Sequence, residues 1–222
     1  MQTNSLIIFI MEEKSSIKTI NSFNESKFKE KGSIFIGKAY EVKNKNEADT
    51  LLAKVRKKYF DATHVCFAYR LVDHTFQYSD DGEPSGTAGI RIMNAIEHHN
   101  LTNTLVMVIR YYGGTKLGVG PLGKAYYKAA YDTLTSAKIK TQKFYSIIKI
   151  IFDYNFTSQV HHIIKQYSAI KISNKFETRP IIECSIESDK ISSLIDELVQ
   201  HSSGTVKTVI LKKDVLIDVS IN

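Results

Sequence analysis

The chain has 222 residues, 43% of them hydrophobic and 24% charged, a balance that excludes an intrinsically disordered protein and allows one or two domains. The formal net charge of +7 favours anionic partners such as RNA, phosphates or acidic proteins. The two cysteines, Cys66 and Cys184, lie far apart within apolar runs, so we expect two buried thiols rather than a disulfide framework or a zinc site.

The N-terminal segment lacks the features of a signal peptide. Its apolar run at 6–10 is too short for the hydrophobic region of a signal, and no basic residue precedes it. Met11 follows directly, and we expect translation to begin there. No apolar run approaches the roughly 20 residues of a membrane span, so we expect no membrane partner. Two reduced thiols suit the cytoplasm, which is where we expect the protein.

The first part of the chain alternates strands with helices. We predict, in order, a strand at 33–42, a helix at 46–58, strands at 64–72 and 74–78, a helix at 87–98, a strand at 104–111 and a helix at 119–137. The run at 64–72 alternates in polarity, which indicates a half-buried strand. The run at 104–111 is almost continuously apolar, which indicates a central strand covered on both faces.

The last part of the chain repeats this pattern on a smaller scale. We predict a strand at 144–152, a helix at 157–167, strands at 169–176 and 181–186, a helix at 189–201 and a strand at 208–219. This β-α-β-β-α-β order is that of ferredoxin-like domains. A polar stretch at 136–143 precedes it, so we place two α+β domains at about 20–139 and 142–220.

A glycine-rich segment at 111–120 follows the central strand and precedes the longest helix. Such a loop aims backbone N–H groups and a helix N-terminus at its mouth, where phosphate or carboxylate binds well. We therefore expect an anion or nucleic-acid site that is formed by Arg70, Arg110, Gly113, Gly114, Lys116, Gly118 and Gly120. The spacing is not that of a Walker A loop. The glycines equally suit a sharp turn and close helix packing, and the flanking tyrosines suit either base stacking or a core.

A second segment at 79–89 is acidic. Asp80, Asp81 and Glu83 carry oxygen ligands of the kind that Mg²⁺ prefers, and with His64 they resemble an acid/base set. The alternative is structural, because Asp-Asp-Gly and Glu-Pro form turns and Ser85 or Thr87 is a suitable helix N-cap. The carboxylates would then pair with arginines such as Arg70 or Arg91.

Four blocks of sequence resemble the YigZ/IMPACT family, and they occur in the family's order. They are ESKFKEKGS at 25–33, ATHVCFAYR at 62–70, SDDGEPSGTAG at 79–89 and RYYGGTKLG at 110–118. The resemblance implies a first domain of the ribosomal protein S5 domain 2 type and a second like the ferredoxin-like last domain of elongation factor G. Eukaryotic members of the family regulate translation under amino-acid starvation by competing for an activator of a kinase.

Two functions are compatible with these features. The first is a non-enzymatic regulator of translation or of a stress response, which binds RNA, the ribosome or a translation-associated protein and needs no cofactor. The second is a metal-assisted hydrolase or phosphate-handling enzyme that uses the two glycine-rich loops. The basic charge and the family resemblance favour the first.

Overall fold

The structure is a computed structural model that describes residues 16–219, so the predicted start at Met11 lies outside the described residues. The chain divides into two compact units, whose main segments are Ile17–Gln142 and Lys143–Asp218. Both contain helices packed on antiparallel strands, and the fold class is therefore α+β. Within residues 16–219, no helix combines the length and apolarity that a membrane span requires.

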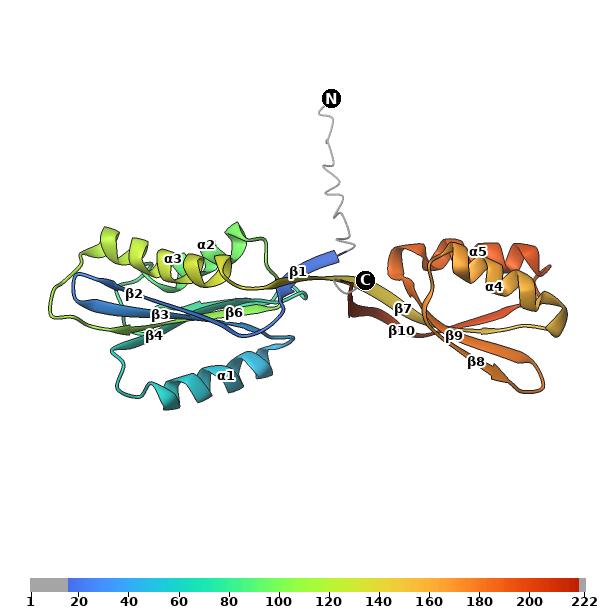
Figure 1. Ribbon diagram of the computed structural model, residues 1–222, viewed down its shortest axis with the longest axis horizontal. Coiled ribbons are helices and arrows are strands. Elements are labelled where there is room, and N and C mark those ends of the chain that lie inside the picture. The colour runs from blue at the N-terminus through green and yellow to red at the C-terminus, as the bar shows by residue number, and fades with distance from the viewer. Residues whose placement is uncertain (1–15, 220–222) are drawn as a thin grey trace, which may run out of the picture. The chain divides into compact units, whose positions relative to one another are not determined.

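The first unit contains a five-stranded sheet in the order β2-β3-β6-β4-β5. Its elements, preceded by β1 (Ser16–Ile20), are β2 (Asn24–Glu30), β3 (Ser33–Glu41), α1 (Lys45–Lys58), β4 (His64–Arg70), β5 (Phe76–Ser79), α2 (Gly89–His98), β6 (Thr104–Tyr111) and α3 (Val119–Thr135). Each pair of neighbouring strands in this sheet is antiparallel. Helix α1 covers one face, and α2 and α3 cover the other (Figure 1).

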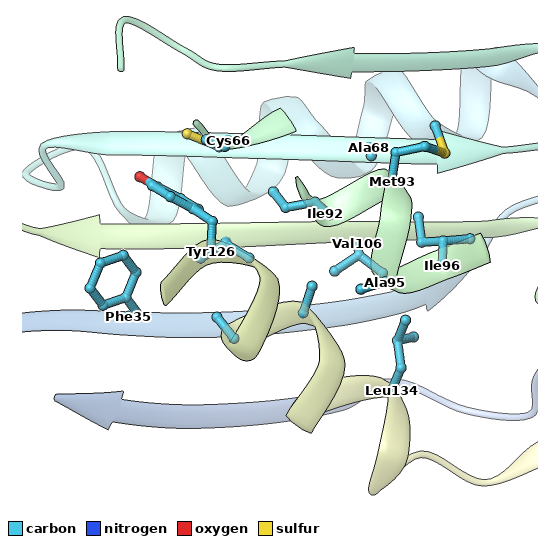
Figure 2. Packing of buried hydrophobic residues seen from close by; sticks show 14 of the residues in the cluster. Phe35, Cys66, Ala68, Ile92, Met93, Ala95, Ile96, Val106, Tyr126 and Leu134 are labelled. Carbon is cyan, nitrogen blue, oxygen red and sulfur yellow. The ribbon is translucent and has the colours of Figure 1, made fainter. Parts of the chain in front are cut away.

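Two apolar cores therefore flank the sheet. Val65, Phe67 and Tyr69 of β4 face α1, whereas Cys66 and Ala68 face α2 and α3. The alternation along β4 is confirmed, but the prediction of a half-buried strand is wrong, since small side chains on the second face are fully covered by α2. Figure 2 shows the core beneath α2 and α3, where the Tyr126 ring lies between Phe35 and Cys66. The central position of β6 is confirmed.

Two strands were not predicted, because their sequences are polar. Strand β2 lies at a sheet edge and reads Asn-Glu-Ser-Lys-Phe-Lys-Glu, so only one face of it has apolar character. Strand β1 is short, and its Lys18 carbonyl accepts a hydrogen bond from the backbone N–H of Thr102 at 2.9 Å. Neither segment carries the apolar run that identifies a buried strand.

The second unit has two helices on one side of its strands (Figure 1). Its elements are β7 (Ile139–Ile151), which contains the boundary between the units, η1 (Tyr154–Phe156), α4 (Thr157–Gln166), β8 (Ile170–Phe176), β9 (Pro180–Glu187), η2 (Ser188–Lys190), α5 (Ile191–His201) and β10 (Lys207–Asp218). Strand β7 pairs with β9 and with β10, and β9 also pairs with β8. Both helices pack their apolar faces on β7 and β9, which closes a separate core.

Candidate functional site at the loop end of the first sheet

Four connections of the first unit meet at one end of its sheet, which we call the loop end. Strand register shows this, because His64 at the start of β4 lies opposite Arg110 near the end of β6, and Ile34 at the start of β3 lies opposite Tyr111. The four connections are 31–32, 59–63, 80–88 and 112–118. Both glycine-rich segments therefore belong to the same end of the molecule's first unit.

Asp80 closes the N-terminus of α2. Its carboxylate accepts hydrogen bonds from the backbone N–H groups of Gly86, Ala88 and Gly89 at 2.8 to 2.9 Å. Burial raises the pKa of Asp80, but the three donors outweigh that effect and hold the pKa below its ordinary value. The expected side-chain cap from Ser85 or Thr87 is not formed, because Asp80 reaches the same amides from the preceding turn.

Asp81 ties the acidic loop to α1 and β4. Its carboxylate pairs with Arg56 Nη2 at 2.9 Å and accepts from the backbone N–H of Val65 at 2.7 Å. The His64 ring contacts the Asp81 carbonyl through Nδ1 at 2.7 Å. The expected partners were Arg70 or Arg91, but Arg56 projects from the last turn of α1 directly beside this loop, and Arg91 donates instead to the Gly86 carbonyl.

Glu83 forms the centre of a buried ionic cluster. One carboxylate oxygen accepts from Arg110 Nη1 at 2.6 Å and from the Tyr126 hydroxyl at 2.7 Å, and the other lies 3.8 Å from His64 Nε2. Only 4% of the Glu83 side chain and 7% of that of Arg110 are exposed. Burial first, then neighbouring Cys66 and Glu83, raises the pKa of Tyr126, so its hydroxyl is neutral and donates to the carboxylate.

These contacts decide what the acidic loop contributes. Asp80, Asp81 and Glu83 are each bound to groups of the protein itself, and they point to different partners rather than to a common centre. Within residues 16–219, no group of three or more His, Cys, Asp or Glu side chains is placed to hold a metal ion. The structure thus brings His64 to Glu83 but gives the three carboxylates structural roles.

The two arginines of the expected anion site do not serve it as free cations. Arg110 is buried against Glu83, so its charge is already compensated. Arg70 pairs with Thr104 at the far end of β4, six residues from His64, which places it about 20 Å from the loop end. The expectation that Arg70 joins the glycine loop is therefore wrong. Arg70 lies near a shared motif in the sequence, but β4 runs away from the loop end and carries Arg70 with it.

The glycine loop at 112–118 remains open to solvent. A Cβ atom at Gly114, Gly118 or Gly120 would meet no atom within 4 Å, and all three residues are exposed. Helix α3 starts after Gly118, which has a φ of 82° and provides no side-chain cap. The first N–H groups of α3 therefore lack the internal partner that Asp80 provides for α2. Lys116 is exposed, and it has no hydrogen bond or ion pair with another described residue.

Gly113 has a different role from the other glycines of this loop. A Cβ atom there would lie 1.9 Å from the Gly32 carbonyl carbon, so the two turns touch backbone to backbone. Ser33, which sequence reasoning missed, reinforces this contact by accepting from the Gly113 N–H at 3.2 Å. Its only sequence signal was its place in the first block shared with the family.

The four tyrosines near the loop divide between core and surface. Tyr126 is fully buried, Tyr127 packs against the core, and the Tyr111 hydroxyl donates to Asp61 at 2.9 Å. Tyr112 is 46% exposed. The stacking alternative therefore applies to Tyr112, while the packing alternative describes Tyr126 and Tyr127.

Comparison with known proteins places these residues in a recognised region. Residues 31–134, which include all four connections of the loop end, match the Impact N-terminal domain. The IMPACT family member YvyE of Bacillus subtilis is 27% identical over 188 residues, which cover 84% of this chain and 87% of that protein. The IMPACT family member YigZ of Escherichia coli is 24% identical over 170 residues, covering 75% of this chain and 83% of that protein.

A solved structure has a similar fold. It is described as the crystal structure of a hypothetical protein and aligns with a TM-score of 0.62, covering 90% of this chain and 99% of that one. Its sequence identity is 21%, so the likeness concerns the fold alone.

Proposed function

This chain belongs to the YigZ/IMPACT family, and from that membership we propose that it is a non-enzymatic regulator of translation or of a stress response. It acts by binding RNA, the ribosome or a translation-associated protein. The observation that carries this proposal is the open glycine loop at 112–118, with an uncapped helix start and an exposed Lys116. Negatively charged groups bind well at such a position.

The charge of the chain supports an anionic partner. The net charge is +7, and the carboxylates of the acidic loop add little negative potential because each is compensated by an arginine or by backbone donors. The loop end therefore presents its exposed lysines without a competing acidic surface from residues 80–83. Ribosomal RNA is a polyanion of the kind that such a surface would attract.

The two units support the finer fold assignment that we also propose. The second unit has the order β-α-β-β-α-β with β7 pairing to β9 and β10, as expected for a ferredoxin-like domain. For the first unit, the family resemblance supports a relation to the S5 domain 2 type. Both domain types occur together in elongation factor G, which fits a partner in the translation apparatus.

Co-sedimentation with ribosomes tests the proposed function. At low salt the full chain is expected to pellet with ribosomes and to be released as salt rises, because phosphate contacts release counterions on binding. Lys116→Ala should weaken the association, whereas Lys45→Ala at the opposite end of α1 should not. Equal sedimentation with and without ribosomes at low salt would contradict ribosome binding, and a salt-independent association would point to a protein partner.

A further inference from the structure

We propose that Tyr112 is a stacking platform for an unpaired base of RNA, with Lys116 and Lys31 holding the adjacent phosphates. This inference rests on the proposed function and goes beyond it, since it names single-stranded RNA as the partner and Tyr112 as the residue that contacts a base. Three features of the loop end support it: the contacts of the Tyr112 ring, the lysines around it, and the space beside it.

The Tyr112 ring is held in place by the buried ionic cluster. The guanidinium carbon of Arg110 lies 5.6 Å from the centre of the Tyr112 ring and 5.5 Å from that of Phe35, so the arginine lies close to both aromatic rings. Arg110 is itself fixed by Glu83 at 2.6 Å. The Tyr112 backbone N–H donates to Thr63 Oγ1 at 2.9 Å. The ring is therefore anchored by its neighbours, yet 46% of the residue is exposed.

An anchored, exposed ring is what base stacking requires. Stacking binds the flat face of any base, and the loss of freedom on binding is small when the protein ring is already fixed. Exposed aromatic rings differ in this support: Phe76 is 63% exposed on β5, and no ring or cation lies against it among the described residues, whereas Phe23, 51% exposed just before β2, lies beside Lys38 and Tyr40.

Two exposed lysines belong to the turns around Tyr112. Lys116 lies four residues further along the same loop, and Lys31 occupies the turn whose Gly32 touches Gly113. Both lysines are exposed, and neither has an ion pair with another described residue. Two exposed carboxylates remain at this end, Glu30 beside Lys31 and Asp61, which accepts from the Tyr111 hydroxyl.

The glycines leave room for a backbone to approach. Nothing lies within 4 Å of a Cβ placed at Gly114 or Gly118, and these residues flank Lys116. A nucleotide chain can therefore run along the loop with its phosphates near the lysine and the amides of α3 while a base reaches Tyr112. A base-paired duplex cannot use the platform, because its base faces are covered by neighbouring pairs. A single-stranded or looped RNA segment is thus the partner that uses every feature of the surface.

Fluorescence anisotropy with the full chain tests this directly. The probe is a labelled 12-nucleotide oligouridine, and a labelled RNA duplex of the same length is the comparison. We expect the single strand to bind more tightly than the duplex at equal salt. Tyr112→Leu should weaken single-strand binding by about 5- to 150-fold, the range for loss of one stacked base. Tyr112→Phe should retain binding, because it keeps the ring, and Phe76→Leu is the matched control that should bind like the wild type.

The lysines have a separate readout. Lys116→Ala and Lys31→Ala should each reduce the slope of log affinity against log salt by about one, whereas Lys45→Ala should leave the slope unchanged. Circular dichroism and urea unfolding confirm that each variant is folded.

The outcomes distinguish this inference from the proposed function. Equal affinity for duplex and single strand, or wild-type affinity in Tyr112→Leu, would overturn the stacking platform while ribosome binding could still stand. Absence of single-strand binding in a chain that still sediments with ribosomes would likewise overturn it and indicate a protein partner or structured RNA. Absence of binding both to the single strand and to ribosomes would overturn the proposed function as well.

Discussion

The buried pair between Glu83 and Arg110 gives the sharpest test of the site's architecture. Replacing Glu83 with leucine leaves the Arg110 guanidinium, which is 7% exposed, without a counter-charge, and it removes the acceptor of the Tyr126 hydroxyl. Removal of one partner from a buried pair costs about 3–5 kcal/mol. We therefore expect Glu83→Leu to lower the free energy of unfolding of the first unit by that amount.

A double-mutant cycle separates the pair from simple loss of packing. In Glu83→Leu/Arg110→Leu no charge is left buried, so the double variant should recover much of the loss, and the coupling between the two sites should reach about 2–3 kcal/mol. The Tyr126 hydroxyl loses its carboxylate acceptor in both variants, which leaves a residual cost of about 1–3 kcal/mol.

Urea unfolding measures these differences. With an m value of about 1–3 kcal/mol per molar, a loss of about 3 kcal/mol moves the midpoint by about 1–3 M. Amide exchange of β4 and β6 identifies the transition of the first unit, since the chain has two units and need not unfold in one step. Additive effects of the two substitutions, or a loss of less than 1 kcal/mol for Glu83→Leu, would refute the interpretation of Glu83 and Arg110 as a coupled structural pair.

Three further outcomes follow from the same geometry. Gly113→Ala should destabilise the first unit by several kcal/mol, because the new Cβ would lie 1.9 Å from the backbone of Gly32. Gly120→Ala has open space and a helical position, so it should be neutral or stabilise the unit by up to about 1 kcal/mol. Thermal unfolding of both variants compares the two effects directly. The pKa of Asp80 is depressed in the folded chain, so its stabilising contribution is present above the ordinary aspartate pKa of about 3.9 and is lost as pH falls through the lower folded-state pKa. Asp80→Asn should therefore flatten the acid side of a plot of unfolding free energy against pH. An unchanged acid side in this variant would contradict the role of Asp80. Burial raises the pKa of Cys66 to about 12 and that of Cys184 to about 11. Neither thiol should therefore react with a thiol reagent at pH 8 until the chain is unfolded. Rapid labelling of a cysteine in the native protein would contradict the burial of that cysteine.

The succession of elements was largely readable from the sequence, because apolar periodicity reports which faces are buried. The alternation in 64–72 correctly placed Val65 and Phe67 on one face of the strand and Cys66 on the opposite face. It did not reveal that α2 covers the second face, because small side chains such as Ala68 suit both a buried and an exposed position. The polar edge strand β2 was not predicted, because an exposed strand needs few apolar residues and so shows little apolar periodicity.

The candidate site was harder to predict, because its organisation depends on contacts distant in sequence. The motif containing Asp80, Asp81 and Glu83 indicated either a metal site or a set of turns, and spacing alone does not separate these. Arg56, Arg110 and backbone N–H donors bind these carboxylates, and only the fold brings those groups close to them. Arg70 was assigned to the wrong end of the sheet, since strand direction cannot be read from a shared block of sequence.

Ultraviolet crosslinking of the full chain to ribosomes tests the central claim most directly, because it reports the contacting residues without substitution. Digestion and mass spectrometry should recover RNA-modified peptides from the 112–118 loop, with Tyr112 as the modified residue and weaker modification around Lys31. Crosslinks confined to residues 143–218, or peptides joined to protein and never to RNA, would contradict the account.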